Sequence, residues 1–184
     1  MSRLTLASLA LTAVFASTGL ITASTSATAQ DAEETRVTNG QKFDAWNVAC
    51  EAIAVNETTC MLNQQLLRAA DQAFITQMVA FWDRAGENRY LSVRVPTGVY
   101  LPAGFAMRTE ESEEITEFTW QTCGRDLCEA LIELDDDLIA KVDAETPVTM
   151  IASYRPSITA EPVVFRFALT GLNAGLTALK PASE

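Results

Sequence analysis

Histidine is absent from this 184-residue chain, and its absence removes whole classes of function. Without an imidazole there is no Ser-His-Asp triad and no Cys-His nucleophile pair. Metal sites that depend on histidine ligands are excluded for the same reason. An enzyme of this composition would have to use carboxylates, lysine, tyrosine or a Ser-Lys pair.

Basic residues are scarce. The chain has 13 Lys and Arg against 24 Asp and Glu, which gives a net charge of −11 at pH 7. An acidic surface repels phosphate backbones and anionic lipid head groups, so we expect neither nucleic-acid binding nor electrostatic attachment to a membrane. The composition favours a protein partner, or a neutral or basic ligand.

Long apolar runs are missing after residue 30, where no stretch approaches the roughly 20 residues that a membrane-spanning helix needs. The early apolar run, Leu4–Ile21, follows Arg3 and precedes an A-x-A motif that ends at Ala29, as in a cleaved signal peptide. A membrane anchor is the competing interpretation. Polar residues interrupt the run and a Ser/Thr-rich segment follows it, so we expect residues 1–29 to be removed and the mature chain to lack a transmembrane span.

Removal of the leader would leave 155 residues with a net charge of −12, enough for one domain with a single core. Residues 30–42 are polar and contain Asn39-Gly40, so we expect a flexible N-terminal tail there. The single domain is expected to cover residues 43–180.

Within that domain, short segments of alternating apolar and polar residues are separated by turn signals, which is typical of an antiparallel β-protein. Two short helices are expected as well, one after the acidic residues Asp135–Asp137 and one at residues 171–179. The expected strands are residues 43–52, 58–67, 73–82, 90–95, 105–108, 148–154 and 163–169, with a hairpin over residues 115–134.

The four cysteines are the most sharply placed residues of the chain. Exported cysteines meet an oxidising compartment, and each close pair flanks an expected turn, so we predict the disulfides Cys50–Cys60 and Cys123–Cys128. Two other pairings are allowed. A four-thiolate zinc site is a further alternative, although its paired ligands are usually two to four residues apart. Redox catalysis is disfavoured because neither pair has the C-x-x-C spacing.

One detail of the second cysteine pair conflicts with strict alternation. If Cys123 and Cys128 face each other, Phe118 and Trp120 point away from the apolar face of the following strand. A single β-bulge near residues 121–124 would restore a common apolar face, and we predict one there.

Acidic clusters and tryptophans are the remaining candidates for a site. Glu110–Glu114 and Asp135–Asp137 could bind calcium or supply paired carboxylates, but neither matches an EF-hand loop, and a solvated loop and a helix start are the plainer interpretations. Trp46, Trp82 and Trp120 could line a ligand groove. Each lies in an apolar strand pattern, which favours packing in the core.

Arg125 and Asp126 lie at the tip of the turn that the second disulfide would close. A rigid, exposed turn is a suitable place for a recognition contact. The plainer interpretation is that the two residues only form the turn.

Several short motifs resemble the invasion-associated locus B family of bacterial envelope proteins. They are Trp46–Cys50, Cys60–Gln64, Leu101–Gly104, Cys123–Ala130 and Phe165–Gly171. The resemblance covers residues 43–180. It implies an immunoglobulin-like β-sandwich and a location in the periplasm or outer envelope of a Gram-negative bacterium, in a family named for host-cell entry. It supplies no catalytic residue and no cofactor.

From these observations we expect an all-β, immunoglobulin-like antiparallel sandwich that is exported, non-enzymatic and free of metal or cofactor, and that acts by binding another protein. Two alternatives stay open: a periplasmic ligand carrier or hydrolase with a tryptophan and carboxylate pocket, and a structural factor for envelope integrity. The periplasm, the outer membrane and the cell surface all stay open as locations. Exposed strand edges would allow a dimer, but no residue argues for one.

Overall fold

The computed structural model describes residues 37–55, 57–142 and 149–181. The predicted leader and the beginning of the predicted tail lie outside these residues. In chain order the elements are β1 (Lys42–Phe43), β2 (Trp46–Ala54), β3 (Glu57–Leu67), β4 (Phe74–Trp82), β5 (Arg89–Pro96), η1 (Leu101–Ala103), β6 (Phe105–Thr109), β7 (Thr116–Cys123), β8 (Leu127–Glu133), α1 (Asp136–Val142), β9 (Thr149–Tyr154), β10 (Val163–Ala168) and α2 (Leu172–Leu179).

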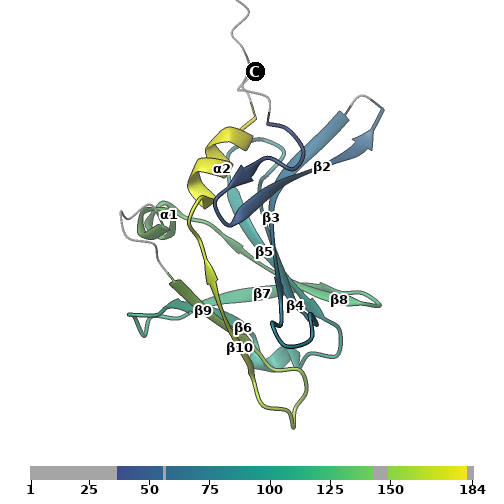
Figure 1. The fold of residues 1–184 in the computed structure, drawn as a ribbon, viewed down its shortest axis with the longest axis vertical. Coiled ribbons are helices and arrows are strands. Elements are labelled where there is room, and N and C mark those ends of the chain that lie inside the picture. Colours follow the sequence, from purple (N-terminus) through teal and green to yellow (C-terminus); the bar gives the residue numbers. More distant parts are fainter. Residues whose placement is uncertain (1–36, 56, 143–148, 182–184) are drawn as a thin grey trace, which may run out of the picture. The chain divides into compact units, whose positions relative to one another are not determined.

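The ten described strands form one antiparallel sheet in the order β1-β2-β3-β4-β5-β8-β7-β6-β9-β10 (Figure 1). Strand β7 connects two layers of this sheet, because it pairs with β8 on one edge and with β6 on the other. The predicted all-β class with short helices is confirmed. The layers are continuous through β7, whereas an immunoglobulin domain packs two separate sheets.

The side chains between the layers form one hydrophobic core. Trp46 and Leu62 come from the first layer, and Phe105 and Phe165 come from the second. The ring centroid of Phe105 lies 4.9 Å from that of Phe118 and 6.1 Å from that of Phe165, so aromatic contacts fill the second layer. Burial of both inner faces explains the two-residue period that the sequence shows.

Helix α2 closes one end of the core. Its buried residues, Leu172, Gly175 and Leu176, pack on strands β1 to β4, and Figure 1 shows the helix across these strands. Helix α1 begins as the acidic run predicts, because Asp135 Oδ1 accepts the backbone N–H of Leu138 at 2.7 Å. Both predicted helices are present.

The structure differs from the sequence expectation at residues 37–42, which were assigned to a flexible tail. Gly40 donates its N–H to Val48 O at 2.8 Å, and Val48 donates to Gln41 O at 2.8 Å. Val37 packs against the core. Backbone hydrogen bonds to β2 hold this segment, and the polar composition of the segment does not reveal them.

The fold requires a residue without a side chain at position 171, which is Gly171. Its φ is +87°, and a Cβ placed there would lie 2.2 Å from Phe43 O. The backbone between β10 and α2 therefore passes directly against the backbone of β1, which only glycine permits.

We predict that Gly171→Ala lowers the free energy of unfolding by about 3–4 kcal/mol, through left-handed strain and a clash with the backbone. Gly98→Ala is the matched control, because Gly98 has φ +90° but has no atom within 4 Å of an added Cβ. Strain alone should cost that control about 1–2 kcal/mol. Urea unfolding of both variants measures their free energies of unfolding. An equal loss of stability in Gly171→Ala and Gly98→Ala would contradict the close approach of the two backbones.

Candidate recognition site

The turn between β7 and β8 is closed by a disulfide. Cys123 and Cys128 are directly opposed in the register, their Cα atoms are 3.9 Å apart, and their sulfurs are bonded. Inside this ring, Gly124 donates its N–H to Leu127 O at 2.8 Å. Four residues, 124–127, are thus held in a small covalent ring at the end of the hairpin.

The strand that leads into this turn contains the predicted β-bulge. The register shifts between Trp120 and Thr122, which leaves Gln121 as the extra residue. Because of this extra residue, Phe118 on β7 and Cys128 on β8 share one apolar face, and both are buried in the core. The prediction of a bulge near residues 121–124 is confirmed, and its cause is the burial of one apolar face.

The turn is also fixed to the neighbouring strand. Thr97, directly after β5, donates its N–H to Asp126 O at 3.0 Å, and its hydroxyl donates to Gly124 O at 3.5 Å. The sequence Pro96-Thr97-Gly98 indicates only a loop and does not reveal this role of Thr97. The hydrogen bonds use backbone carbonyls of the turn, so no side-chain pattern in the sequence points to them.

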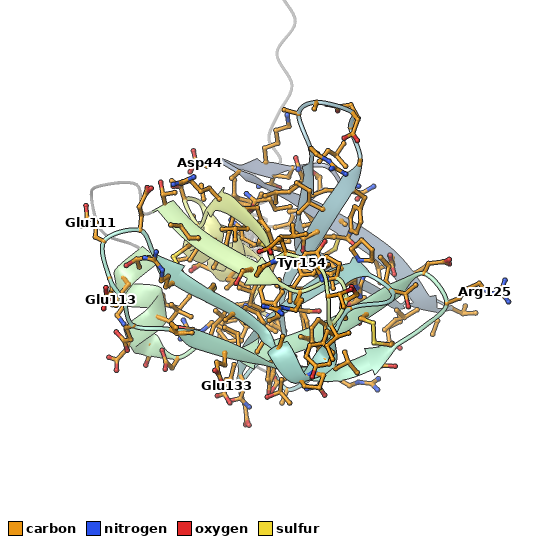
Figure 2. All side chains as sticks on the ribbon, turned by 90° about the horizontal axis from the view of Figure 1, so that it is seen from below. Asp44, Glu111, Glu113, Arg125, Glu133 and Tyr154 are labelled. Carbon is orange, nitrogen blue, oxygen red and sulfur yellow. A yellow bond between two sulfur atoms is a disulfide. The ribbon has the colours of Figure 1, made fainter. Side chains whose placement is uncertain are left out.

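Arg125 and Asp126 are both exposed, and neither side chain has a hydrogen-bond or ionic partner among the described residues. Figure 2 shows Arg125 extended away from the rest of the domain. Other arginines are engaged: Arg68 pairs with Asp71, and Arg166 pairs with Glu110. The stapled turn therefore presents an available guanidinium and an available carboxylate on a rigid backbone.

The first cysteine pair closes a second hairpin. Cys50 and Cys60 are opposed in β2 and β3, with Cα atoms 4.0 Å apart and their sulfurs bonded. Both predicted pairs are therefore bonded in the structure, and no free cysteine is left. The zinc alternative is wrong, because a four-thiolate site needs these sulfurs as thiolates.

The acidic loop Glu110–Glu114 is organised by basic residues. Arg108 donates to the backbone carbonyls of Thr109 and Ser112, each at 3.0 Å. Lys141 pairs with Glu114 at 3.1 Å. Figure 2 shows Glu111 and Glu113 at the surface. Within the described ranges, no cluster of three or more His, Cys, Asp or Glu is arranged to hold a metal, and the loop has the geometry of a solvated connection.

The tryptophans do not meet in one groove. Trp46 is fully buried in the core. Trp82 donates its indole N–H to Leu176 O at 2.7 Å beside α2, whereas Trp120 donates to Leu101 O at 3.1 Å beside η1. The indole nitrogens of Trp82 and Trp120 thus bind backbone carbonyls of separate elements, whereas Nε1 of the buried Trp46 has no hydrogen-bond partner among the described residues.

Asp83 is a carboxylate whose pKa the fold shifts. The backbone N–H of Glu87, 2.9 Å from Asp83 Oδ1, is the largest cause, and the side chain and backbone N–H of Asn88 add to it. These hydrogen bonds favour the ionised form and lower the pKa of Asp83 below 3.8. They shape the turn between β4 and β5, so the role is structural.

Comparison with known proteins agrees with this geometry. The family model described as invasion associated locus B (IalB) protein matches residues 46–180. This chain belongs to the invasion associated locus B family. The family interpretation of the cysteine and strand motifs is confirmed.

A solved structure supports the fold of this family member. The crystal structure of invasion associated protein B from Bartonella henselae is similar with a TM-score of 0.61 and 17% identity, over 77% of this chain and 95% of that chain. At that identity the similarity concerns the fold. No curated protein matches the chain. None of the helices described in this family member is long and apolar enough to cross a membrane.

For Asp83 we predict a pKa below 3.8 by NMR titration of its carboxyl group. Because the pKa is lower in the folded state, ionised Asp83 stabilises the fold above a pH of about 4, and this contribution is lost as the pH falls through the folded pKa. Asp83→Asn, which has no titrating group there, should lose less stability than the wild type between pH of about 5 and 2. A measured pKa of 3.8 or higher would contradict the hydrogen bonding described here.

Proposed function

We propose that this family member is an exported, non-enzymatic envelope protein that binds another protein through the turn closed by Cys123–Cys128. The observation that carries the proposal is the state of Arg125 and Asp126: both are exposed on a turn that is covalently closed, and neither side chain has a partner among the residues that the structure describes. A rigid turn loses little conformational entropy when it binds, so its contacts contribute more fully to affinity.

Export is supported by two independent features. The first residues have the three parts of a signal peptide. Both cysteine pairs form disulfides, which persist in the periplasm and outside the cell and are rare in the cytosol. The family description, invasion associated, supports a partner on a host surface, while a structural role in the bacterial envelope is the second candidate.

A binding role is supported by the chemistry that the chain retains. Histidine is absent, and all four cysteines are used in disulfides. The guanidinium of Arg125 can donate two parallel hydrogen bonds to a carboxylate of the partner, and the neighbouring carboxylate of Asp126 can accept backbone N–H groups. The net charge of −11 favours a protein with basic or neutral contact residues over a nucleic acid.

We predict that the double variant Arg125→Ala, Asp126→Ala captures its partner at least about tenfold less than the wild type, because central Arg contacts are frequent hot spots. The bait is the purified, oxidised protein, and the measurement is quantitative pull-down from an envelope extract and from a host-cell surface extract. Arg68→Ala, Asp71→Ala is the matched control, since it removes the same two charges from another exposed turn.

An equal loss of partner capture by the Arg68 and Asp71 control variant would contradict a contact specific to the turn closed by Cys123–Cys128. Unchanged capture by the Arg125 and Asp126 variant would also contradict it. Finding no partner in either extract would count against protein binding itself.

A further inference from the structure

Two polar atoms inside the core lack a hydrogen-bond partner. Trp46 is fully buried, and Gln64 is only 9% exposed. Among the residues that the structure describes, Trp46 Nε1 and Gln64 Oε1 are the buried side-chain atoms that form no hydrogen bond. Buried polar groups are almost always paired, because removing them from water without a new partner costs free energy. These two atoms therefore point to a further partner inside the core.

Trp46 and Gln64 are immediate neighbours on adjacent strands. Val48 on β2 is opposite Leu62 on β3, and both are buried. Extended by two residues, the same register places Trp46 opposite Gln64 on this inner face. Val48 directs its N–H away from β3, to Gln41 O at 2.8 Å. The pair of Trp46 with Gln64 is therefore of the non-hydrogen-bonded kind, in which opposed side chains lie closest.

Two backbone carbonyls fix the orientation of the Gln64 amide. Its Nε2 donates to Ala45 O at 3.2 Å and to Ala168 O at 3.3 Å. Only the nitrogen of an amide side chain can donate, so exchanging its two ends would set an oxygen against both carbonyls. Oε1 is therefore the end that requires a donor. The indole nitrogen of Trp46 is a donor only, and it requires an acceptor.

We propose that one water molecule is bound between Trp46 and Gln64 as an integral part of the core. The oxygen of this water accepts the indole N–H of Trp46, and one of its hydrogens is donated to Gln64 Oε1. Water is both an acceptor and a donor, so a single molecule satisfies the two atoms together. A direct hydrogen bond between them is not formed, because each atom lacks a partner.

This site explains why a polar amide lies in an otherwise apolar core. Ala45 lies between β1 and β2, and Ala168 is the last residue of β10, so the Gln64 amide joins the first and the last strands of the sheet order. The water extends this connection to the side chain of Trp46 on β2. Helix α2 packs on β2 and β3, and Trp46 is fully buried, so exchange of the water with solvent requires the core to open.

The test is an NMR experiment on the isotope-labelled, oxidised protein that records cross-peaks between water and the indole N–H groups. In the rotating-frame spectrum, a water held close to the indole gives a cross-peak opposite in sign to the diagonal, whereas proton exchange with solvent gives the same sign. Trp82 is the internal control, because its indole N–H donates to Leu176 O at 2.7 Å. We expect the opposite-sign cross-peak at Trp46 and none at Trp82.

Two matched substitutions test the acceptor. Gln64→Met removes Oε1 and should abolish the cross-peak at Trp46, whereas Gln77→Met should leave it unchanged. Gln77 is half-buried on the neighbouring strand β4, and its amide donates to Asn63 Oδ1 at 3.0 Å on the other face of the sheet. Thermal melts by circular dichroism show whether each variant keeps the fold.

An opposite-sign cross-peak at Trp46 that Gln64→Met removes and Gln77→Met preserves supports the proposal. The absence of this cross-peak at Trp46, an equal cross-peak at Trp82, or a cross-peak that persists in Gln64→Met would overturn it. If Gln64→Met does not fold, the comparison of Trp46 with Trp82 in the wild type decides the question, because it requires no substitution.

Discussion

The cross-strand disulfides hold this structure together at the two places where hydrophobic burial ends. Cys50 and Cys60 are half-buried at the rim of the core, and the residues beyond them on β2 are exposed. Cys128 is buried, whereas Cys123 and the turn are exposed. An exposed two-stranded ribbon is marginal in water, so a covalent bond at its base replaces the missing burial. Each disulfide thus keeps the two strands of a solvent-exposed hairpin end in register.

This arrangement explains where the available chemistry lies. The other arginines of the described residues are engaged, as Arg166 is with Glu110 and Arg94 with Glu129. Among the described residues, Arg125 is the arginine whose guanidinium keeps no partner, and it lies at a stapled end beside Asp126.

Much of the fold could be predicted from the sequence, because its signals are local. Alternation located the strands, turn residues located the hairpins, and the conflict between Cys123 and Trp120 located the bulge. The segment at residues 37–42 could not be predicted, since it is held by backbone hydrogen bonds to β2 and by Val37. The strand order could not be predicted either, because the pairing of β6 with β9 depends on contacts distant in sequence.

The candidate site could be predicted in part, because some of its sequence signals are also local. Arg125 and Asp126 stood out as turn residues between two cysteines, but nothing in the sequence showed that Thr97 fixes the turn to β5. Similarly, the expected strand over residues 43–52 ends before Ala54, where β2 ends. That this part of β2 extends beyond its neighbours is evident only once the ends of the neighbouring segments, at Cys50 and Leu62, are known.

The most direct test of the central claim is amide hydrogen exchange on the oxidised protein and on the protein reduced with a phosphine. If the staples replace burial at the hairpin ends, reduction should speed exchange at residues 50–60 and 121–128 by about 30-fold or more. Amides of the core strands β4 and β5 should keep their protection. Uniform acceleration over the whole sheet, or no change at the hairpin ends, would contradict the account.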